Sequence, residues 1–161
     1  MTILIVGQCG SGKTWCCKKI IEKYKLSINA KIKTIYYKTN GKLTVLGKYT
    51  NHIFDGSDRL SMSVMKDAVH LKRLQEAHNM IILAEGDRFM NKTFIDKFKP
   101  FIIKIKDDGA KGRMLRKSKQ TERQIKTIRT RVNNINENLS VQNSNEALKK
   151  IIHIIDENIK T

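Results

Sequence analysis

The most informative segment of this 161-residue chain reads Gly7-Gln8-Cys9-Gly10-Ser11-Gly12-Lys13-Thr14. It follows a short β-branched run at residues 2–6 and precedes apolar residues at helical spacing over 13–24. The segment matches the Walker A pattern at every specified position. Glycines in this pattern let successive backbone amides face phosphate oxygens, and the start of the following helix adds its positive end. A phosphate-binding loop between a strand and a helix is therefore predicted.

Each residue type in this loop has an expected task. Lys13 is expected to bridge the β- and γ-phosphates of ATP and so to act in catalysis, and the Thr14 hydroxyl is expected to ligate Mg²⁺. The predicted ATP-binding residues are Gly7, Gly10, Ser11, Gly12, Lys13 and Thr14. The alternative is a chance glycine-rich turn with a structural lysine, and the strand and helix that flank the loop argue against it.

A second candidate follows the apolar run at residues 80–84, where the chain continues with Glu85-Gly86-Asp87-Arg88. A hydrophobic strand that ends in a carboxylate is typical of the Walker B arrangement, in which the acid holds the Mg²⁺ shell beside the phosphate loop. Glu85 and Asp87 are both candidates, and their spacing does not separate them. Arg88 is expected to act in catalysis or substrate binding as a counter-charge for phosphate. The alternative is an ordinary surface turn, in which Gly-Asp is common.

The candidates for acceptor chemistry lie between residues 47 and 61. This stretch contains Gly-Lys-Tyr-Thr at 47–50 and Phe-Asp-Gly-Ser-Asp-Arg-Leu-Ser at 54–61. An acid here would face the γ-phosphate from the acceptor side, so Asp58 is the candidate general base and Arg59 a candidate substrate ligand. The structural alternative is that Ser57 or Asp58 caps the next helix and that Asp-Gly forms a turn.

Together, these segments resemble the bacteriophage 5-hydroxymethyluracil DNA kinases. Those small P-loop kinases have a similar pattern, with Gly-Lys-Tyr, then Gly-Thr-Asp-Arg-Leu-Ser, then a strand that ends in Glu-Gly-Asp-Arg. The resemblance runs in separate blocks from Ile3 to about Ile135, and Ser57 keeps the hydroxyl of the family's threonine. It implies ATP-dependent phosphorylation of the hydroxymethyl group of a modified pyrimidine in DNA, a step in phage DNA base hypermodification. It also supports Asp58 as the base or an acceptor-site residue.

The charge of the chain is strongly unbalanced. Thirty-two Lys and Arg residues stand against fifteen Asp and Glu residues, which gives a net charge of +17 at pH 7. A charge of this size repels itself in a compact protein, so an extended anionic partner such as DNA is expected. The alternative is a solubility property, or the lysine bias of an AT-rich genome.

Over half of this charge lies in residues 99–131, which contain twelve basic and three acidic side chains. One long helix is predicted at about 112–136, with an apolar stripe opposite a basic one. The basic stripe comprises Arg116, Lys119, Arg123 and Lys126. As a basic helical lid over ATP at about 107–131, this segment would contribute Arg116 and Arg123 to catalysis. The alternative is a solvated, lysine-rich face.

Few aromatic side chains are available to stack on a base. The candidates are Tyr36, Tyr37, Tyr49 and Phe89. Tyr49 is preferred because it lies in the 47–50 segment. The predicted substrate-binding set is therefore Tyr49, Asp58, Arg59 and Arg88. Residues 141–145 precede the last predicted helix and are a candidate for holding adenine through backbone groups, with a helix cap as the alternative.

The apolar patterns predict a single domain over residues 1–161. Strands are expected at 2–6, 30–38, 43–46, 80–84, 101–105 and 140–141, and helices at 13–24, 61–78, 91–99, 112–136 and 145–159. The Asn40-Gly41 pair predicts a hairpin. This alternation indicates a P-loop kinase-like α/β fold, with a doubly wound, mostly parallel sheet and helices on both faces. Ligands bind at the carboxyl ends of the strands in such sheets.

Several classes of protein are disfavoured. No apolar run approaches the roughly 18–20 residues of a membrane span, and the amino end lacks the pattern of a signal peptide. Three cysteines within nine positions predict neither a disulfide framework nor a zinc site. A cytoplasmic protein is expected, in the host cell if the chain is of phage origin.

Two other functions compete with a DNA kinase. One is a nucleoside monophosphate kinase that acts on free nucleotides, and the phosphate loop does not separate it from a DNA kinase. The other is a nucleic-acid-binding ATPase that transfers phosphate only to water. The excess positive charge favours a polymer over a free nucleotide. The sequence context, the strandedness of the DNA and the oligomeric state stay open.

Overall fold

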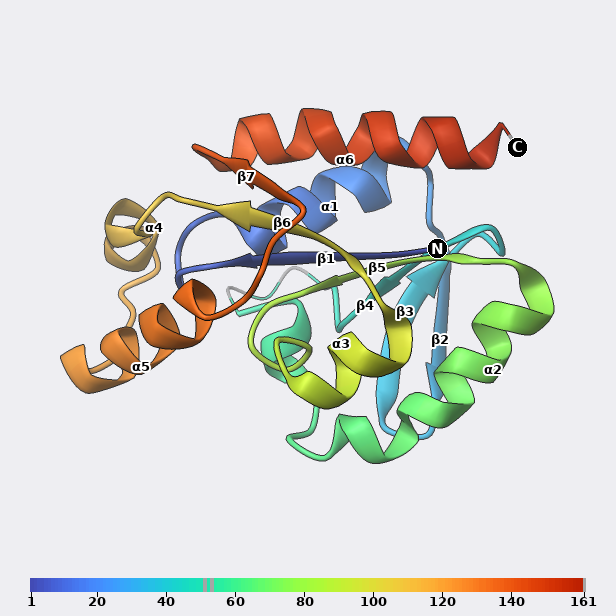
Figure 1. The fold of residues 1–161 in the computed structure, drawn as a ribbon, viewed down its shortest axis with the longest axis horizontal. Helices are drawn as coiled ribbons and strands as arrows, with labels where there is room; N and C mark the ends of the chain where they lie inside the picture. The colour runs from blue at the N-terminus through green and yellow to red at the C-terminus, as the bar shows by residue number, and fades with distance from the viewer. Residues whose placement is uncertain (51, 53, 161) are drawn as a thin grey trace.

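The computed structural model describes every residue except 51, 53 and 161. It is an α/β structure, and its described strands form one seven-stranded sheet in the order β2-β3-β4-β5-β1-β6-β7 (Figure 1). The strands are β1 (Thr2–Gly7), β2 (Ile28–Ile32), β3 (Ile35–Thr39), β4 (Leu43–Leu46), β5 (Ile81–Glu85), β6 (Phe101–Ile105) and β7 (Leu139–Val141). From β4 to β7 the neighbouring strands are parallel, whereas β2, β3 and β4 pair antiparallel. The prediction of a mostly parallel sheet is confirmed.

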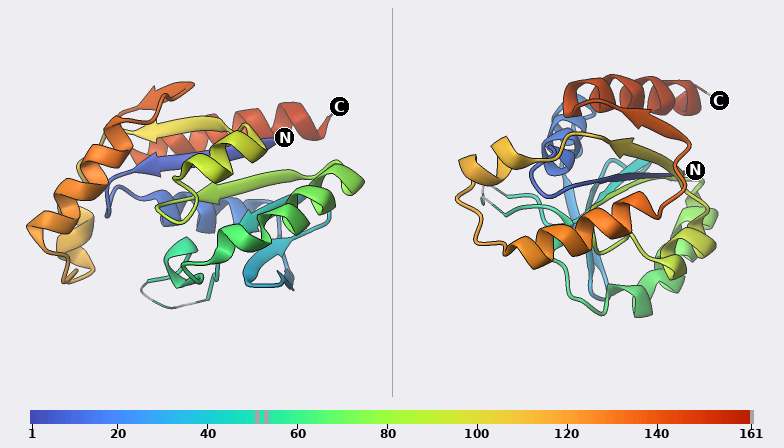
Figure 2. Two further views of the ribbon diagram at one scale, coloured as in Figure 1. Left: turned by 60° about the horizontal axis from the view of Figure 1, so that its bottom comes forward. Right: turned by 60° about the vertical axis from the view of Figure 1, so that its left-hand side comes forward.

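Helices cover both faces of the sheet (Figure 2). One face carries α1 (Lys13–Lys23) and α6 (Ser144–Ile159); the other carries α2 (Ala68–His78), α3 (Lys92–Phe98) and α5 (Glu122–Asn133). Successive side chains of a strand point to opposite faces. In β1, Ile3 and Ile5 therefore pack with α1 and α6, while Leu4 and Val6 pack with α2, α3 and α5. The strand before the phosphate loop is thus buried on both sides.

The predicted strand at 30–38 is two strands. The chain reverses between β2 and β3 at Lys33, which has a φ of 54°. Asp67, just before α2, holds the turn by accepting hydrogen bonds from the amide and hydroxyl of Thr34, at 3.0 and 2.5 Å. A local pattern does not contain this distant contact. The Asn40-Gly41 hairpin is confirmed between β3 and β4.

The predicted helix at 112–136 is interrupted. The chain forms α4 (Ala110–Leu115) and then α5, joined by residues 116–121. Lys117 has a φ of 49°, a left-handed conformation that stops a helix. Thr121 then begins α5 through a capping box with Gln124. The start signal at Thr121 and Gln124 was present in the sequence, and it outweighs the continuous apolar spacing.

This break divides the predicted basic stripe. Arg116 caps the end of α4 and Lys119 lies in the connecting segment, whereas Arg123 and Lys126 belong to α5. The prediction of one continuous basic helix is therefore wrong.

The remaining predicted elements are found close to their expected bounds. The helix expected from residue 61 differs most, because residues 64–67 form a 3-10 turn and α2 begins at Ala68. In the described part of the chain, no helix has both the length and the apolar character needed to cross a membrane.

Candidate functional site

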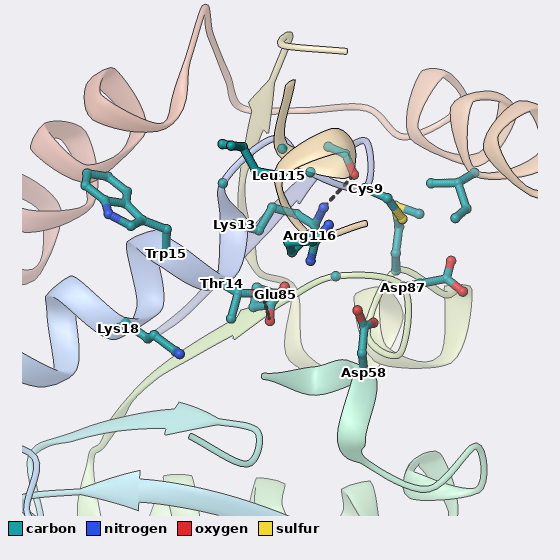
Figure 3. Close-up of a pocket in the computed structure, with 17 residues that line it drawn as sticks. Cys9, Lys13, Thr14, Trp15, Lys18, Asp58, Glu85, Asp87, Leu115 and Arg116 are labelled. Atoms are coloured by element: carbon teal, nitrogen blue, oxygen red, sulfur yellow. Dashed lines mark hydrogen bonds between the residues drawn. The ribbon is translucent and has the colours of Figure 1, made fainter. Parts of the chain in front are cut away.

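A cavity of about 390 Å³ lies at the carboxyl edge of the sheet (Figure 3). Its walls come from the phosphate loop and the first turn of α1, the 47–61 loop, the end of β5, and the end of α4. The parallel strands β1 and β5 both end here, which is where ligands bind in sheets of this kind. The fold therefore brings the loop and the three candidate acids Asp58, Glu85 and Asp87 to one cavity.

The phosphate loop has no room for side chains at two of its glycines. Gly10 and Gly12 have φ values of 89° and 93°, in the left-handed region. A Cβ at Gly10 would lie 2.3 Å from the carbonyl oxygen of Gly109, and one at Gly12 would lie 2.5 Å from the Cβ of Ser144. The loop is therefore enclosed between the start of α4 and the start of α6.

Lys13 folds back over the loop that precedes it. Its ammonium donates hydrogen bonds to the carbonyl oxygens of Gly7 and Gln8, at 2.9 and 2.7 Å. An anion on the loop would compete with these carbonyls for the ammonium, because opposite full charges attract each other more strongly than a cation attracts a neutral carbonyl.

Thr14 and Glu85 contact each other at the cavity. The Thr14 hydroxyl donates to Glu85 Oε1 at 3.1 Å, and the backbone amide of Ser57 donates to the same oxygen at 3.2 Å. Glu85 is 3% exposed. Its burial raises the pKa of the carboxyl; the charge of Lys13 opposes this rise, and the charge of Asp58 adds to it.

Asp87 also lines the cavity, but its carboxylate is bound by a residue of α5 rather than by Thr14. Its two carboxylate oxygens accept hydrogen bonds from Nη1 of Arg131 on α5, at 2.8 and 3.0 Å. The structure therefore separates the two acids that spacing left equivalent. Glu85 contacts the Thr14 hydroxyl, whereas Asp87 ties the end of β5 to α5.

The oxygen groups around Thr14 fit a small divalent cation. Mg²⁺ prefers hard oxygen ligands and is usually held by one or two carboxylates together with phosphate oxygens, rather than by a complete protein cage. Among the described residues, no three His, Cys, Asp or Glu side chains are grouped to hold a metal, so phosphate would have to complete such a shell. The buried Ser57 hydroxyl, next to the amide that contacts Glu85, has no hydrogen-bond partner in the described structure. A ligand oxygen could satisfy that group.

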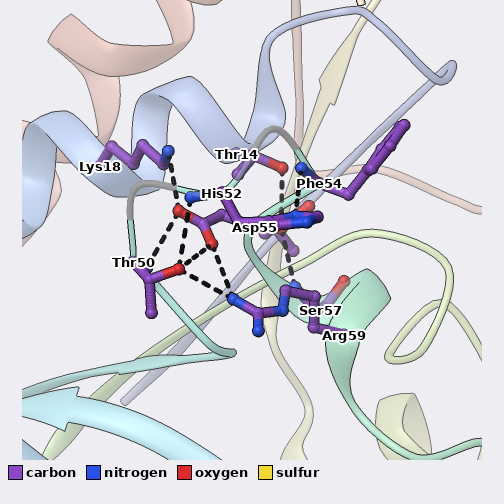
Figure 4. A network of polar contacts seen from close by, with 9 residues as sticks. Thr14, Lys18, Thr50, His52, Phe54, Asp55, Ser57 and Arg59 are labelled. Carbon is purple, nitrogen blue, oxygen red and sulfur yellow. Dashed lines mark hydrogen bonds and ion pairs between the residues drawn. The ribbon is translucent and has the colours of Figure 1, made fainter.

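The 47–61 loop is anchored by Asp55 (Figure 4). The buried Asp55 carboxylate accepts hydrogen bonds from the Lys18 ammonium at 2.9 Å and from the amide and hydroxyl of Thr50 at 2.9 and 3.0 Å. Burial favours a raised pKa, but the bonds from Lys18 and Thr50 outweigh it and lower the pKa of Asp55 below its usual value. This side chain was expected only in a turn, and its partner on α1 was not predictable from the local sequence.

Arg59 belongs to the same anchor. Its guanidinium donates to Thr50 Oγ1 at 2.9 Å and to Asp55 Oδ1 at 3.2 Å. The predicted role of Arg59 as a substrate ligand is not supported by this position. Arg59 instead holds the shape of the loop that carries Asp58.

Asp58 faces the cavity from this anchored loop (Figure 3). It is exposed and lies in the 3-10 turn Ser57–Arg59, which begins after Gly56 with no side-chain cap. The N-cap of α2 is Asp67. The structure therefore does not use Ser57 or Asp58 as a helix cap, and the structural alternative for Asp58 is wrong.

A second hollow of about 310 Å³ adjoins the cavity and shares Asp58 and Arg116 with it. Its other walls include Phe54, Lys119 and Gln120. Arg123 lines a third hollow, also of about 310 Å³, which runs along α5 and shares Asp87 and Ile128 with the main cavity. Of the two predicted lid arginines, Arg116 at the end of α4 lines the main cavity, whereas Arg123 of α5 lines only this third hollow.

Two other predicted substrate ligands, Tyr49 and Arg88, form hydrogen bonds within the protein. Tyr49 is 8% exposed, and its hydroxyl donates to the Leu46 carbonyl oxygen at 3.1 Å. Burial raises the pKa of this hydroxyl well above its usual value. The prediction that Tyr49 stacks on a base is therefore wrong. Arg88 donates through Nε to the Leu60 carbonyl oxygen at 3.2 Å, which links the end of β5 to the 47–61 loop.

The segment before α6 behaves as a cap. Asn143 accepts a hydrogen bond from the Glu146 amide at 3.0 Å, and the Glu146 carboxylate accepts one from the Gln142 amide at 2.8 Å. The capping alternative for residues 141–145 is therefore confirmed. The adenine contact at these residues stays a prediction.

Two exposed aromatic side chains at the cavity were not among the predicted site residues. Trp15 is 38% exposed and lines the main cavity, and Phe54 is 44% exposed and lines the adjoining hollow. Trp15 directly follows Thr14, and Phe54 begins the 54–61 segment. Their position next to these segments was the signal that could have identified them.

Comparison with known proteins identifies no relative of this chain. No family model, no curated protein and no solved structure matches it. The functional argument therefore rests on the residues and geometry described above.

Proposed function

We propose that this chain is a P-loop kinase that transfers the γ-phosphate of ATP to the hydroxymethyl group of 5-hydroxymethyluracil, or of a similar hydroxymethylated pyrimidine, in DNA. The observation that carries the proposal is one cavity whose wall combines Lys13 and Thr14 of the phosphate loop with the carboxylates of Glu85 and Asp58. A phosphate donor requires cations and amides, and an acceptor hydroxyl requires a base. This cavity supplies both sets of groups.

The donor end would use the phosphate loop and the end of β5. Lys13 would exchange its bonds to the Gly7 and Gln8 carbonyls for bonds to phosphate oxygens, and the amides at the start of α1 would face the same anion. Thr14 and Glu85 would hold Mg²⁺, which when bound neutralises charge on the phosphate oxygens.

Asp58 would serve the acceptor. Its carboxylate would accept the proton of the hydroxymethyl group while the hydroxyl oxygen forms a bond to the γ-phosphorus. The bond from that phosphorus to the β,γ-bridging oxygen breaks, and ADP leaves. Arg116, which lines both the cavity and the adjoining hollow, would stabilise the charge on the transferred group.

The hollow beside Asp58 suits a flat, polar ring. Phe54 provides an exposed aromatic face. The Gln120 amide now donates to Cys9 Sγ and accepts from Ser118 Oγ, and it could exchange these partners for the donor and acceptor groups of a base. These residues replace Tyr49 in the proposed recognition of the base. A base inside a duplex must leave the stack to enter such a site, so a flipped base or a single strand is expected.

The positive charge supports a polymeric acceptor. The chain carries a net charge of +17, and each DNA phosphate neutralised by Lys or Arg releases counterions, which makes DNA affinity fall as salt rises. In this proposal the segment at about 107–131, now two helices, acts as a basic lid that contributes Arg116.

The decisive experiment is transfer from γ-labelled ATP to oligonucleotides that contain uracil, thymine, 5-hydroxymethyluracil or 5-hydroxymethylcytosine. Label is expected only on a hydroxymethylated base, and the oligonucleotide is expected to be a better acceptor than the matching free nucleotide. Equal or better labelling of the free nucleotide, without salt dependence, would favour a nucleoside monophosphate kinase. Release of phosphate to water alone would favour a nucleic-acid-binding ATPase.

A matched pair of charge reversals tests the acceptor hollow. Lys119 lines the hollow, whereas Lys126 is an exposed lysine of α5 that does not. Lys119→Glu is expected to raise the KM for the oligonucleotide and to flatten its salt dependence, while Lys126→Glu changes both less. The KM for ATP should stay the same in both variants. A rise in the KM for ATP instead would assign Lys119 to the donor side.

A further inference from the structure

The cavity around the phosphate loop has two chemically different ends. Carboxylates gather at one end, where Asp58 faces the loop. Trp15 and Leu115 are apolar members of the wall, and Figure 3 shows Trp15 on the far side of Lys13 from Asp58. The phosphate loop lies between the two ends. A ligand with an anionic centre and an apolar end would fit this arrangement.

Trp15 and Leu115 leave much of their apolar surface uncovered. Their exposed fractions are 38% and 70%. Trp15 is the only tryptophan of the chain and lies one residue after Thr14, in the first turn of α1. Large apolar side chains at the rim of a cavity gain free energy when a flat ligand covers them. Any ligand held by the phosphate loop would already lie beside Trp15.

We propose that the indole of Trp15 stacks on the base of the nucleoside triphosphate whose phosphates bind the loop, and that Leu115 covers the base from α4. A nucleoside triphosphate has the polarity of this cavity, with an anionic chain that ends in the γ-phosphate and a flat base at the opposite end. With the γ-phosphate toward Asp58, the base extends toward Trp15. This inference rests on the proposed function, because it takes ATP as the phosphate donor.

The same wall predicts weak discrimination between bases. The polar side chain of the cavity wall that Figure 3 shows beside Trp15 is Lys18, and its ammonium is already paired with Asp55 at 2.9 Å. Stacking tolerates any base because every base has a π-face, whereas discrimination requires hydrogen bonds to the base edge. Trp15 and Leu115 therefore hold ATP and GTP with affinities within a few-fold of each other.

The single tryptophan makes direct binding measurable. The full chain is titrated with ATP, GTP and inorganic tripolyphosphate in the presence of Mg²⁺, with tryptophan emission and calorimetry as two readouts. We expect ATP and GTP to quench Trp15 emission at similar concentrations, and tripolyphosphate to bind with a much smaller change in emission. Calorimetric binding of ATP without a change in emission would overturn the proposal, as would a preference for one purine of more than about a hundredfold.

Three variants test whether the indole of Trp15 contributes to ATP affinity. Trp15→Ala is expected to weaken ATP binding about five- to hundredfold and to leave tripolyphosphate affinity unchanged, while Trp15→Phe retains most of the ATP affinity. Met114→Ala is the matched control, because Met114 is 73% exposed next to Leu115 and is not part of the cavity wall. Circular dichroism verifies that each variant folds. Wild-type affinity for ATP in a folded Trp15→Ala chain would overturn the proposal.

These measurements separate the two levels of inference. If the wild-type chain binds neither ATP nor tripolyphosphate, the proposed function fails. If it binds both with equal affinity and Trp15→Ala has no effect, the phosphate site stands and the stacking role of Trp15 is wrong.

Discussion

Asp55 in the 47–61 loop and Glu85 at the end of β5 are both buried carboxylates, each 3% exposed. Their pKa values nevertheless move in opposite directions, down for Asp55 and up for Glu85. Asp55 contacts two cationic side chains, Lys18 and Arg59. Glu85 accepts its hydrogen bonds from a neutral hydroxyl and a backbone amide.

The two residues differ in whether cationic side chains of the protein compensate the buried negative charge. A buried carboxylate is costly unless hydrogen bonds and a cation compensate for lost hydration. Asp55 receives both from the protein, so its burial serves the shape of the loop. Within the described part of the chain, Glu85 receives hydrogen bonds but no direct contact from a cationic side chain. In the proposed function a bound cation would supply that contact. Equal burial can therefore serve stability in one region and binding in another.

The largest effect on activity is expected for Lys13, whose charge opposes the pKa rise of Glu85. Lys13→Ala should abolish phosphate transfer, because Lys13 is the cation that the loop itself carries. The fold should survive, since the hydrogen bonds of the ammonium end on loop carbonyls rather than on core groups. Labelled-ATP transfer and circular dichroism measure the two effects. Normal transfer in the folded variant would remove the assignment of the ATP site.

Asp58, unlike Asp55 and Glu85, is an exposed carboxylate. Asp58→Asn should lower kcat by about 10²–10⁴, the usual contribution of a general base, with little change in ATP affinity. Thermal stability should not change, because Asp58 is exposed and caps no helix. Steady-state kinetics at saturating ATP measure kcat. Weakened ATP binding with normal turnover would instead assign Asp58 to the metal shell.

Asp55→Asn should act on stability. We expect a loss of about 1.5–3 kcal/mol at neutral pH, the range for hydrogen bonds to charged groups. The loss should lie at the lower end of this range, because the Lys18 and Arg59 side chains are 42% and 32% exposed. A lowered folded-state pKa gives stability that is present above the usual value of 3.8 and is lost as the pH falls through the folded-state pKa.

Denaturant unfolding at neutral and acidic pH measures this loss. The difference between the wild type and Asp55→Asn should shrink as the pH falls below 3.8. Asp58→Asn is the control, because it removes a nearby exposed acid without breaking the anchor. A difference that stays constant with pH would show that packing, rather than charge, is lost.

Glu85→Gln should change stability by less than Asp55→Asn, and in the opposite direction. A raised folded-state pKa means that the wild type loses stability as the pH rises from 4.5 through the folded-state pKa. Glutamine does not ionise and can still accept the Thr14 hydrogen bond, so the variant should equal or exceed the wild type at neutral pH. Unfolding curves across this range measure the difference. Destabilisation as large as that of Asp55→Asn would show that the Glu85 carboxylate stabilises the fold, which would contradict the difference proposed between the two residues.

Local patterns were sufficient for the scaffold of the site. The β-branched run of β1, the glycines at 7–12 and the apolar spacing of α1 act within a few residues, so they correctly predicted a strand, a glycine-rich loop and a helix in this order. The same holds for the carboxylate at the end of β5 and for the Asn40-Gly41 hairpin. The cap at Thr121 was also local, although the apolar spacing across it favoured one long helix.

The task of each side chain depended on groups from distant segments. Tyr49 and Asp55 are buried because their loop packs against α1 and the sheet. Asp87 forms an ion pair with Arg131 of α5. Exposure and protonation follow from the charges, dipoles and water that surround a side chain, and these neighbours are assembled only when the chain has folded. For that reason the sequence identified which acids come near the phosphate loop, but the three-dimensional contacts separated Glu85 from Asp87 and revealed Asp55 as the anchor.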